Sequence, residues 1–320
     1  MLRRSKFKKL KPSLIAGLCL ALGAPGGAAW AQKPDDVVIK VDTHLVVLHA
    51  TVVDKNGRLV TTLPQSAFQV YENGARQELK LFKREDIPVS LGLVIDNSGS
   101  MRDKRAKVAA AAQDLVKDSN PEDEEFVVNF NDDAFLDTPD FTNNPKVLEQ
   151  ALTKIDSRGG TAMRDAIRMS IDHIKQKAKK DKKVILVVTD GNDNASMISL
   201  ENLVRAAQQS EVIIYAIGLL SDEERREAKR AKRALDALTE ATGGQVYYPK
   251  ELADVDRIAH QVAHDIRNQY TLGYTPTNPA LDGSFHQIRV VASGPGRPVV
   301  RTRTGYYATP EMARSKSSGF

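Results

Sequence analysis

The sequence predicts an α/β protein with a doubly wound, mostly parallel sheet and a flanking domain that resembles a β-sandwich. Between about residues 87 and 268, short apolar runs alternate with amphipathic stretches, as strands and helices do around a parallel sheet. The segments on either side, 32–86 and 269–308, are rich in alternating β patterns. Neither flank is long enough to fill a core alone. We therefore expect the two flanks to pack together, with the α/β domain inserted between them.

The first 31 residues are typical of a secretory signal peptide. Six basic residues lie within residues 1–11, an uncharged apolar segment covers 12–23, and Ala29-Trp30-Ala31 is a small-x-small cleavage signal. The apolar segment is short for a membrane span. We expect cleavage after Ala31 and export to the periplasm or the exterior, rather than retention as an anchor, and no membrane span after cleavage.

Cleavage would remove the basic excess of the chain. The whole sequence has a formal charge of +5, but residues 1–31 hold six basic residues and no acidic one, so the mature charge becomes −1. This charge argues against nucleic acid or an anionic membrane as a partner. The only cysteine, Cys19, also lies in the leader. The mature protein would therefore have no disulfide and no cysteine metal ligand.

The β-rich segment after the leader is expected to form a long strand followed by a hairpin. The long strand covers residues 45–53, and Asp-Lys-Asn-Gly at 54–57 is a tight-turn signal. A second strand begins at Phe68 and leads to Asn73-Gly74, a pair suited to the positive φ angles of hairpin turns. Alternation near residue 80 completes this segment.

The central segment is expected to alternate buried strands with amphipathic helices. The strands are expected at 91–95, 126–130, 184–188 and 212–217. The helices are expected near 102–119, 145–155, 163–179, 200–209 and 224–242, and a last helix carries Val255, Ile258, Ala259, Val262 and Ile266 on one face. The chain then returns to strands at 270–274, 288–290 and 299–307, and residues 309–320 form a polar, flexible tail.

Oxygen-bearing side chains lie in the turns that follow two buried strands and in one glycine-rich loop. In a parallel sheet such turns meet at one rim, where ligands of open α/β sheets bind. The set contains carboxylates and hydroxyls but neither sulfur nor imidazole, which suits Mg²⁺, with Mn²⁺ or Ca²⁺ as alternatives. The candidate metal residues are Asp96, Ser98, Ser100, Thr161 and Asp190.

These motifs together resemble the metal-ion-dependent adhesion site of the von Willebrand factor A domain. Asp-Asn-Ser-Gly-Ser at 96–100, Thr161 and Asp190-Gly191 match the family's positions in order, and the resemblance covers about residues 88–268. It implies direct ligation of the metal by both serines of the first motif. It also implies that Thr161 ligates directly or through water, and that the two aspartates act mainly through bridging waters. The flanks, including Phe-Gln-Val-Tyr-Glu-Asn-Gly at 68–74, look like those of bacterial secreted proteins related to this family.

The resemblance implies an exported, non-catalytic module that uses Mg²⁺ to bind a glutamate or aspartate of a protein partner. Two carboxylates only just neutralise the cation, so the ion stays electrophilic and a partner can take an open coordination position. A structural envelope component with a stabilising metal is one alternative, and a metal-dependent hydrolase is another. The sequence lacks Gly-x-Ser-x-Gly, His-Glu-x-x-His and a phosphate-binding Gly-x-x-x-x-Gly-Lys-[Ser/Thr] motif, and no candidate base is evident.

Other polar residues have simpler explanations. Asp165 lies just inside a predicted helix start and is expected to act on the helix dipole or behind the metal ligands. His260 and His264 are spaced as a zinc pair on a helix, but no third ligand is evident, so a surface or packing role is expected. Three further acids are expected to be solvated loop residues or to tune the charge of the rim: Asp132, Asp133 and Asp193.

Overall fold

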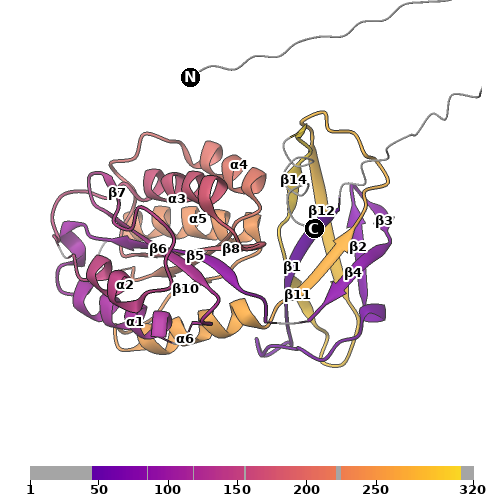
Figure 1. The fold of residues 1–320 in the computed structure, drawn as a ribbon, viewed down its shortest axis with the longest axis horizontal. Coiled ribbons are helices and arrows are strands. Elements are labelled where there is room, and N and C mark those ends of the chain that lie inside the picture. Colours follow the sequence, from indigo (N-terminus) through magenta and orange to yellow (C-terminus); the bar gives the residue numbers. More distant parts are fainter. Residues whose placement is uncertain (1–44, 85, 118, 155, 221–224, 311–320) are drawn as a thin grey trace, which may run out of the picture. The chain divides into compact units, whose positions relative to one another are not determined.

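The computed structural model describes residues 45–310, apart from residues 85, 118, 155 and 221–224 (Figure 1). The signal peptide predicted for residues 1–31 lies outside the described residues, as does most of the predicted tail. Within the described ranges, no helix is both long enough and apolar enough to cross a membrane.

A six-stranded sheet forms the centre of the α/β part, in the order β10-β9-β8-β5-β6-β7. Its strands are β5 (Val89–Asp96), β6 (Glu124–Phe130), β7 (Ala134–Leu136), β8 (Lys182–Thr189), β9 (Ile213–Gly218) and β10 (Val246–Tyr247). All neighbours are parallel except the edge pair of β6 and β7, which is antiparallel. Every residue of β5 is buried, as expected of a central strand covered on both faces. The predicted mostly parallel sheet is confirmed.

Helices cover both faces of this sheet (Figure 1). They are α1 (Arg105–Lys117), α2 (Pro145–Leu152), α3 (Met163–Lys177), α4 (Leu200–Ser210), α5 (Arg225–Thr242) and α6 (Asp254–Arg267). Leu91, Leu93 and Ile95 of β5 share one core with α1, α2 and α6, whereas Val94 enters the core formed with α3, α4 and α5. Because the side chains of β5 pack into apolar cores on both faces of the sheet, the strand is held in place, and so is the motif that follows its last residue.

Strands from both flanking segments build two four-stranded antiparallel sheets. Their orders are β13-β1-β11-β4 and β14-β12-β2-β3. The strands are β1 (Val46–Val53), β2 (Phe68–Glu72), β3 (Ala75–Gln77), β4 (Leu79–Lys83), β11 (Tyr270–Tyr274), β12 (Phe285–Ala292), β13 (Val299–Arg301) and β14 (Gly305–Tyr307). β1 pairs with β11 and β13, β2 pairs with β12, and both sheets contribute to one apolar core. The predicted sandwich of N- and C-terminal segments is confirmed.

Two local expectations have different outcomes. Asn73 and Gly74 have φ angles of 48° and 82° and join β2 to β3, as the hairpin prediction required. The single strand predicted for 299–307 is wrong, because β13 and β14 belong to different sheets. Between them, the Thr302 hydroxyl donates to the His49 carbonyl oxygen at 2.9 Å, and the chain passes from one sheet to the other. The alternating sequence pattern of residues 299–307 continues through this change of sheet, so the pattern alone does not reveal it.

Candidate metal centre

The first predicted residue of the site, Asp96, joins the carboxyl ends of two neighbouring strands. It is the last residue of β5, and its side chain is fully buried. Its Oδ1 accepts a hydrogen bond from the Ser98 amide at 2.8 Å, and its Oδ2 accepts one from the Thr189 hydroxyl at 2.6 Å. Thr189 ends β8, which lies beside β5 in the sheet. The sheet therefore fixes the position of this carboxylate.

The two serines and Asp190 form a continuous hydrogen-bonded group. The Ser98 and Ser100 hydroxyl oxygens lie 3.2 Å apart, and the Ser100 hydroxyl donates to Asp190 Oδ1 at 2.7 Å. Asp190 directly follows β8, so residues about ninety positions apart in the chain meet at one rim. Ser98 is buried whereas Ser100 is exposed, so the group opens to solvent on the side of Ser100.

Thr161 approaches the same rim from the loop before α3. Its amide donates to Asn194 Oδ1 at 2.8 Å, and the Gly99 amide donates to the Gly159 carbonyl oxygen at 3.2 Å. A Cβ placed on Gly191 would lie 3.7 Å from the Thr161 hydroxyl oxygen, so this hydroxyl faces the turn after β8. The structure thus brings all five predicted residues, from three separate segments, to one rim.

The rim already concentrates paired charges. Burial raises the pKa of Asp96 to about 6, although hydrogen bonds from Ser98 and Thr189 lower it. The Lys104 ammonium lies 2.5 Å from Asp190 Oδ2. Arg105 is fully buried at the start of α1, where burial lowers its pKa to about 10 and the charge of Asp96 raises it. Two carboxylates are therefore balanced by two nearby cationic side chains.

The donor set fits a small, hard cation. Ligands at right angles around Mg²⁺, each about 2.1 Å from the ion, would be about 3 Å apart. The 3.2 Å between the Ser98 and Ser100 oxygens is close to that spacing. Over the part of the chain that the structure describes, no group of three or more His, Cys, Asp or Glu side chains could hold a metal. Hydroxyls would therefore have to supply direct ligands here.

The neighbouring acids mainly hold loop backbone in place. Asp132 Oδ1 accepts from the Gly160 amide at 2.6 Å, and Asp193 Oδ2 accepts from the Arg164 amide at 2.7 Å. Asp165 accepts from the Met197 and Ile198 amides at 2.9 and 3.1 Å. These roles in positioning the loops around Thr161 were not evident from the sequence, because the acids bond to backbone distant in the chain.

Two further features of the site were also missed. The sequence gives no sign that the Lys104 ammonium pairs with Asp190, or that the Thr189 hydroxyl donates to Asp96.

The histidine pair on α6 lies away from this rim. His260 and His264 are both exposed, and within the described ranges no further His, Cys, Asp or Glu joins them as a third ligand.

A strand-end rim of this kind, on a mostly parallel sheet covered by helices, is the architecture of the von Willebrand factor A domains. Residues 91–192 match the family model for the von Willebrand factor type A domain. The matched segment contains all of the predicted site motifs, in agreement with the resemblance that those motifs carry.

Several solved structures are similar to this chain at low sequence identity. A von Willebrand factor type A protein from Catenulispora acidiphila is 13% identical with a TM-score of 0.49, covering 79% of this chain and 76% of that one. The vWF domain of the type V pili tip protein Mfa5 from Porphyromonas gingivalis is 15% identical with a TM-score of 0.45, covering 57% and 97%. The PilB minor pilin from Streptococcus sanguinis is 15% identical with a TM-score of 0.46, covering 57% of this chain. This chain spans 62% of that pilin's length. No curated protein sequence matches.

Proposed function

We propose that this protein is an exported, non-catalytic binding module that holds Mg²⁺ at the rim and binds an acidic residue of a protein partner. The observation that carries this proposal is the hydrogen-bonded group of Asp96, Ser98, Ser100 and Asp190, with Ser100 open to solvent. We take the binding domain to cover residues 87–268, between the flanking segments 32–86 and 269–308.

In this proposal the two serine hydroxyls ligate the metal directly, and Thr161 does so directly or through water. The carboxylates of Asp96 and Asp190 act mainly through bridging waters. Their existing contacts support this division, because Asp96 accepts hydrogen bonds on both oxygens and Asp190 is held by Ser100 and Lys104. Neutral hydroxyl ligands leave most of the charge of the ion uncompensated.

The charge balance of the rim favours an acidic partner. Without metal, Lys104 and Arg105 already offset the two aspartates. A divalent cation would therefore leave an excess of positive charge at a solvent-exposed position, which attracts a carboxylate and disfavours a cationic partner. A glutamate or aspartate of a protein could satisfy both the open coordination position and this charge.

The same contacts disfavour a hydrolytic role. A serine nucleophile needs a neighbouring base that can take its proton. The group that accepts from the Ser100 hydroxyl is Asp190, which is itself paired with the Lys104 ammonium. Both Asp190 oxygens are therefore already engaged, Oδ1 by the Ser100 hydroxyl and Oδ2 by the Lys104 ammonium. A metal-dependent hydrolase and a structural envelope component remain the alternatives that the following experiment separates.

We expect Asp96→Ala to abolish metal-dependent partner capture. The substitution removes the acceptor that fixes both Ser98 and Thr189, so the hydroxyl ligands lose their alignment. Envelope extracts would be passed over the immobilised wild-type and variant proteins, each with Mg²⁺ and with a chelator. His260→Ala, an exposed change on α6, is the control and should behave as wild type.

The pattern of capture distinguishes the three functions. Proteins retained only by wild type with Mg²⁺, while circular dichroism shows that the variant is folded, support the binding module. Recovery of the same proteins in all four conditions contradicts it. Metal stabilisation without a metal-dependent partner would instead support the structural component, and metal-dependent turnover of a captured protein would support the hydrolase.

A further inference from the structure

A cavity lies at the end of the central sheet opposite the candidate metal centre, where the parallel strands begin. Its volume is about 270 Å³, and it is enclosed by the end of α1, the residues leading into β6 and the start of α2. Val116, Pro121 and Leu148 form apolar walls, and Ser119, Asn120 and Glu125 supply polar groups. This cavity shares no residue with the rim that carries Asp96 and Asp190.

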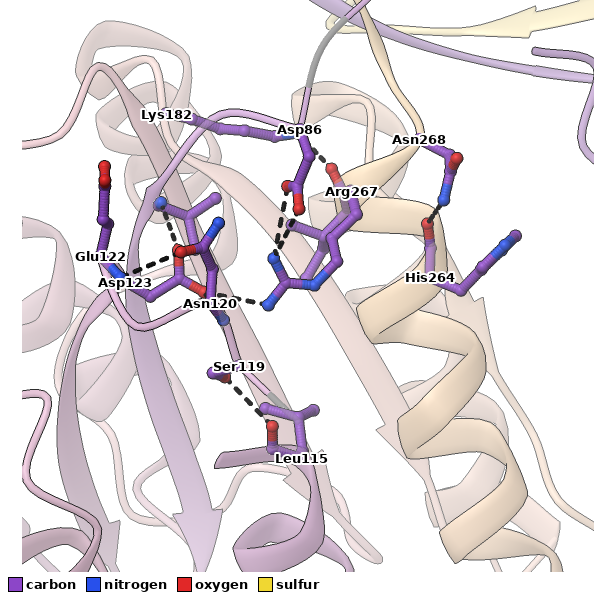
Figure 2. Close-up of polar contacts among 12 residues, drawn as sticks. Asp86, Leu115, Ser119, Asn120, Glu122, Asp123, Lys182, His264, Arg267 and Asn268 are labelled. Carbon is purple, nitrogen blue, oxygen red and sulfur yellow. Dashed lines mark hydrogen bonds and ion pairs between the residues drawn. The ribbon is translucent and has the colours of Figure 1, made fainter. Parts of the chain in front are cut away.

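Glu125 is the unusual group in this cavity. It is only 2% exposed, and neither carboxylate oxygen has a hydrogen-bond partner among the described residues. Burial raises its pKa to about 7, although the nearby Ser119 hydroxyl lowers it. That hydroxyl donates to the Leu115 carbonyl oxygen at 3.1 Å (Figure 2). A buried carboxylate without a donor is costly, so the position calls for a proton or a ligand.

The charged groups nearby are already engaged with one another (Figure 2). Asp123 accepts from the Val89 amide at 2.9 Å and from the Asn120 amide at 2.9 Å. Arg267 donates to Asp123 and to Asp86, both at 3.1 Å. This network ties the strand starts to the end of α6, and its acids and its arginine compensate each other.

The lysine that lines the cavity is also paired with an acid. Lys117 lines the cavity, but its ammonium pairs with Asp114 at 3.0 Å on the same helix. Glu125 is therefore the one acidic side chain among the cavity-lining residues whose carboxylate receives no hydrogen bond from the described residues. A ligand with a positive charge and several N–H donors would neutralise this carboxylate and supply the hydrogen bonds that it lacks.

We propose that this cavity binds a primary alkylammonium group, with its nitrogen against the Glu125 carboxylate and its carbon chain against Val116 and Leu148. The apolar walls suit a short alkyl chain. A hard metal ion requires about six oxygen ligands, whereas within the described residues no group of three or more acidic, histidine or cysteine side chains could hold a metal ion. An anion would meet the carboxylate and is disfavoured.

The test uses the full chain and n-butylammonium chloride, followed by isothermal titration calorimetry at about pH 8. Wild type should show saturable binding, and Glu125→Gln should weaken it by about 10-fold or more, because a charge-assisted hydrogen bond is lost. Glu122→Gln changes an exposed acid in the turn before β6 and should bind as wild type. The neutral probe 1-butanol should not distinguish the three proteins.

Two further arms identify the source of the ammonium group. Nα-acetyl-lysine amide represents a lysine side chain of a protein, and n-butylammonium represents a free amine. Binding of either one, lost in Glu125→Gln, supports the proposal and names the source. Unchanged affinity in Glu125→Gln, or no saturable binding of either probe by wild type, overturns it. Glu125→Gln keeps the shape of the side chain, and circular dichroism verifies that the variant is folded.

Affinity should also depend on pH in a direction that cavity shape alone would not produce. Binding requires ionised Glu125, so it should strengthen as the pH rises from about 6 to about 8. The charged groups facing Glu125 are Asp123 from the loop before β6, Arg267 from α6 and Lys117 from α1. The affinity of Glu125→Gln should not change over this range, and a pH-independent wild type would contradict the assignment.

Discussion

Replacing both Ser98 and Ser100 with alanine should lower the affinity for Mg²⁺ by at least about 100-fold, because the change removes the two proposed direct ligands. The hydroxyls lie 3.2 Å apart and contribute no apolar packing to the core. The loss should therefore appear in metal binding and not in folding. Calorimetric titration with Mg²⁺ measures the affinity, and thermal unfolding in a chelator measures the stability of the metal-free protein.

A serine elsewhere in the same domain provides the matched control. Ser170 lies inside α3, and its hydroxyl donates to the Ala166 carbonyl oxygen at 2.8 Å, away from the rim residues. Ser170→Ala should bind Mg²⁺ as wild type does. If the double alanine variant binds Mg²⁺ with wild-type affinity, the serines are not ligands and the proposed site is wrong.

Gly244→Ala should reduce the free energy of unfolding by more than about 3 kcal/mol, because the added methyl group has no space. Its Cβ would overlap the Ile214 carbonyl oxygen and lie 2.6 Å from the Ile214 carbonyl carbon. Ile214 belongs to the buried strand β9, and the Gly244 amide donates to the Thr239 carbonyl oxygen at 3.0 Å. Neither backbone can move away without breaking these contacts. Denaturant unfolding measures the change.

Gly294→Ala is the matched control for this effect. A Cβ there would lie 2.9 Å from Leu63 Cδ2, the end of a flexible side chain, and 3.9 Å from Pro298 Cγ, which is ordinary van der Waals contact. We expect a change within about 1 kcal/mol. Equal losses in the two variants would show that steric contact with the β9 backbone does not control the stability of this turn.

The main elements of the fold could be predicted because their sequence patterns are local. The uninterrupted apolar run at 91–95 corresponds to β5, which is buried throughout, and the apolar face of the last predicted helix packs on the sheet as α6. The short edge strand β7 (Ala134–Leu136) was not predicted, since three residues carry no periodicity. The change of sheet between Arg301 and Gly305 was missed for a related reason: it depends on partners distant in the chain.

The candidate site was likewise predicted only in part. Asp96, Ser98 and Asp190 could be placed at one rim because the carboxyl ends of parallel strands lie at the same edge of a sheet. The contacts that hold the two aspartates could not be predicted, because each joins residues distant in the chain: Lys104 pairs with Asp190, and Thr189 donates to Asp96, 93 positions away. The sequence also gives no sign that the Glu125 carboxylate lacks a donor, because Glu125 is one acid in the run 122–125 at the start of β6.

The most direct test of the proposed metal centre is a crystal of the protein soaked with Mn²⁺ and measured for anomalous scattering. We predict one anomalous peak at the rim, about 2 Å from the hydroxyl oxygens of Ser98 and Ser100. Excess Mg²⁺ should remove it. No peak at this position, or a peak only at sites elsewhere on the molecule, would contradict the assignment of the rim as the metal centre.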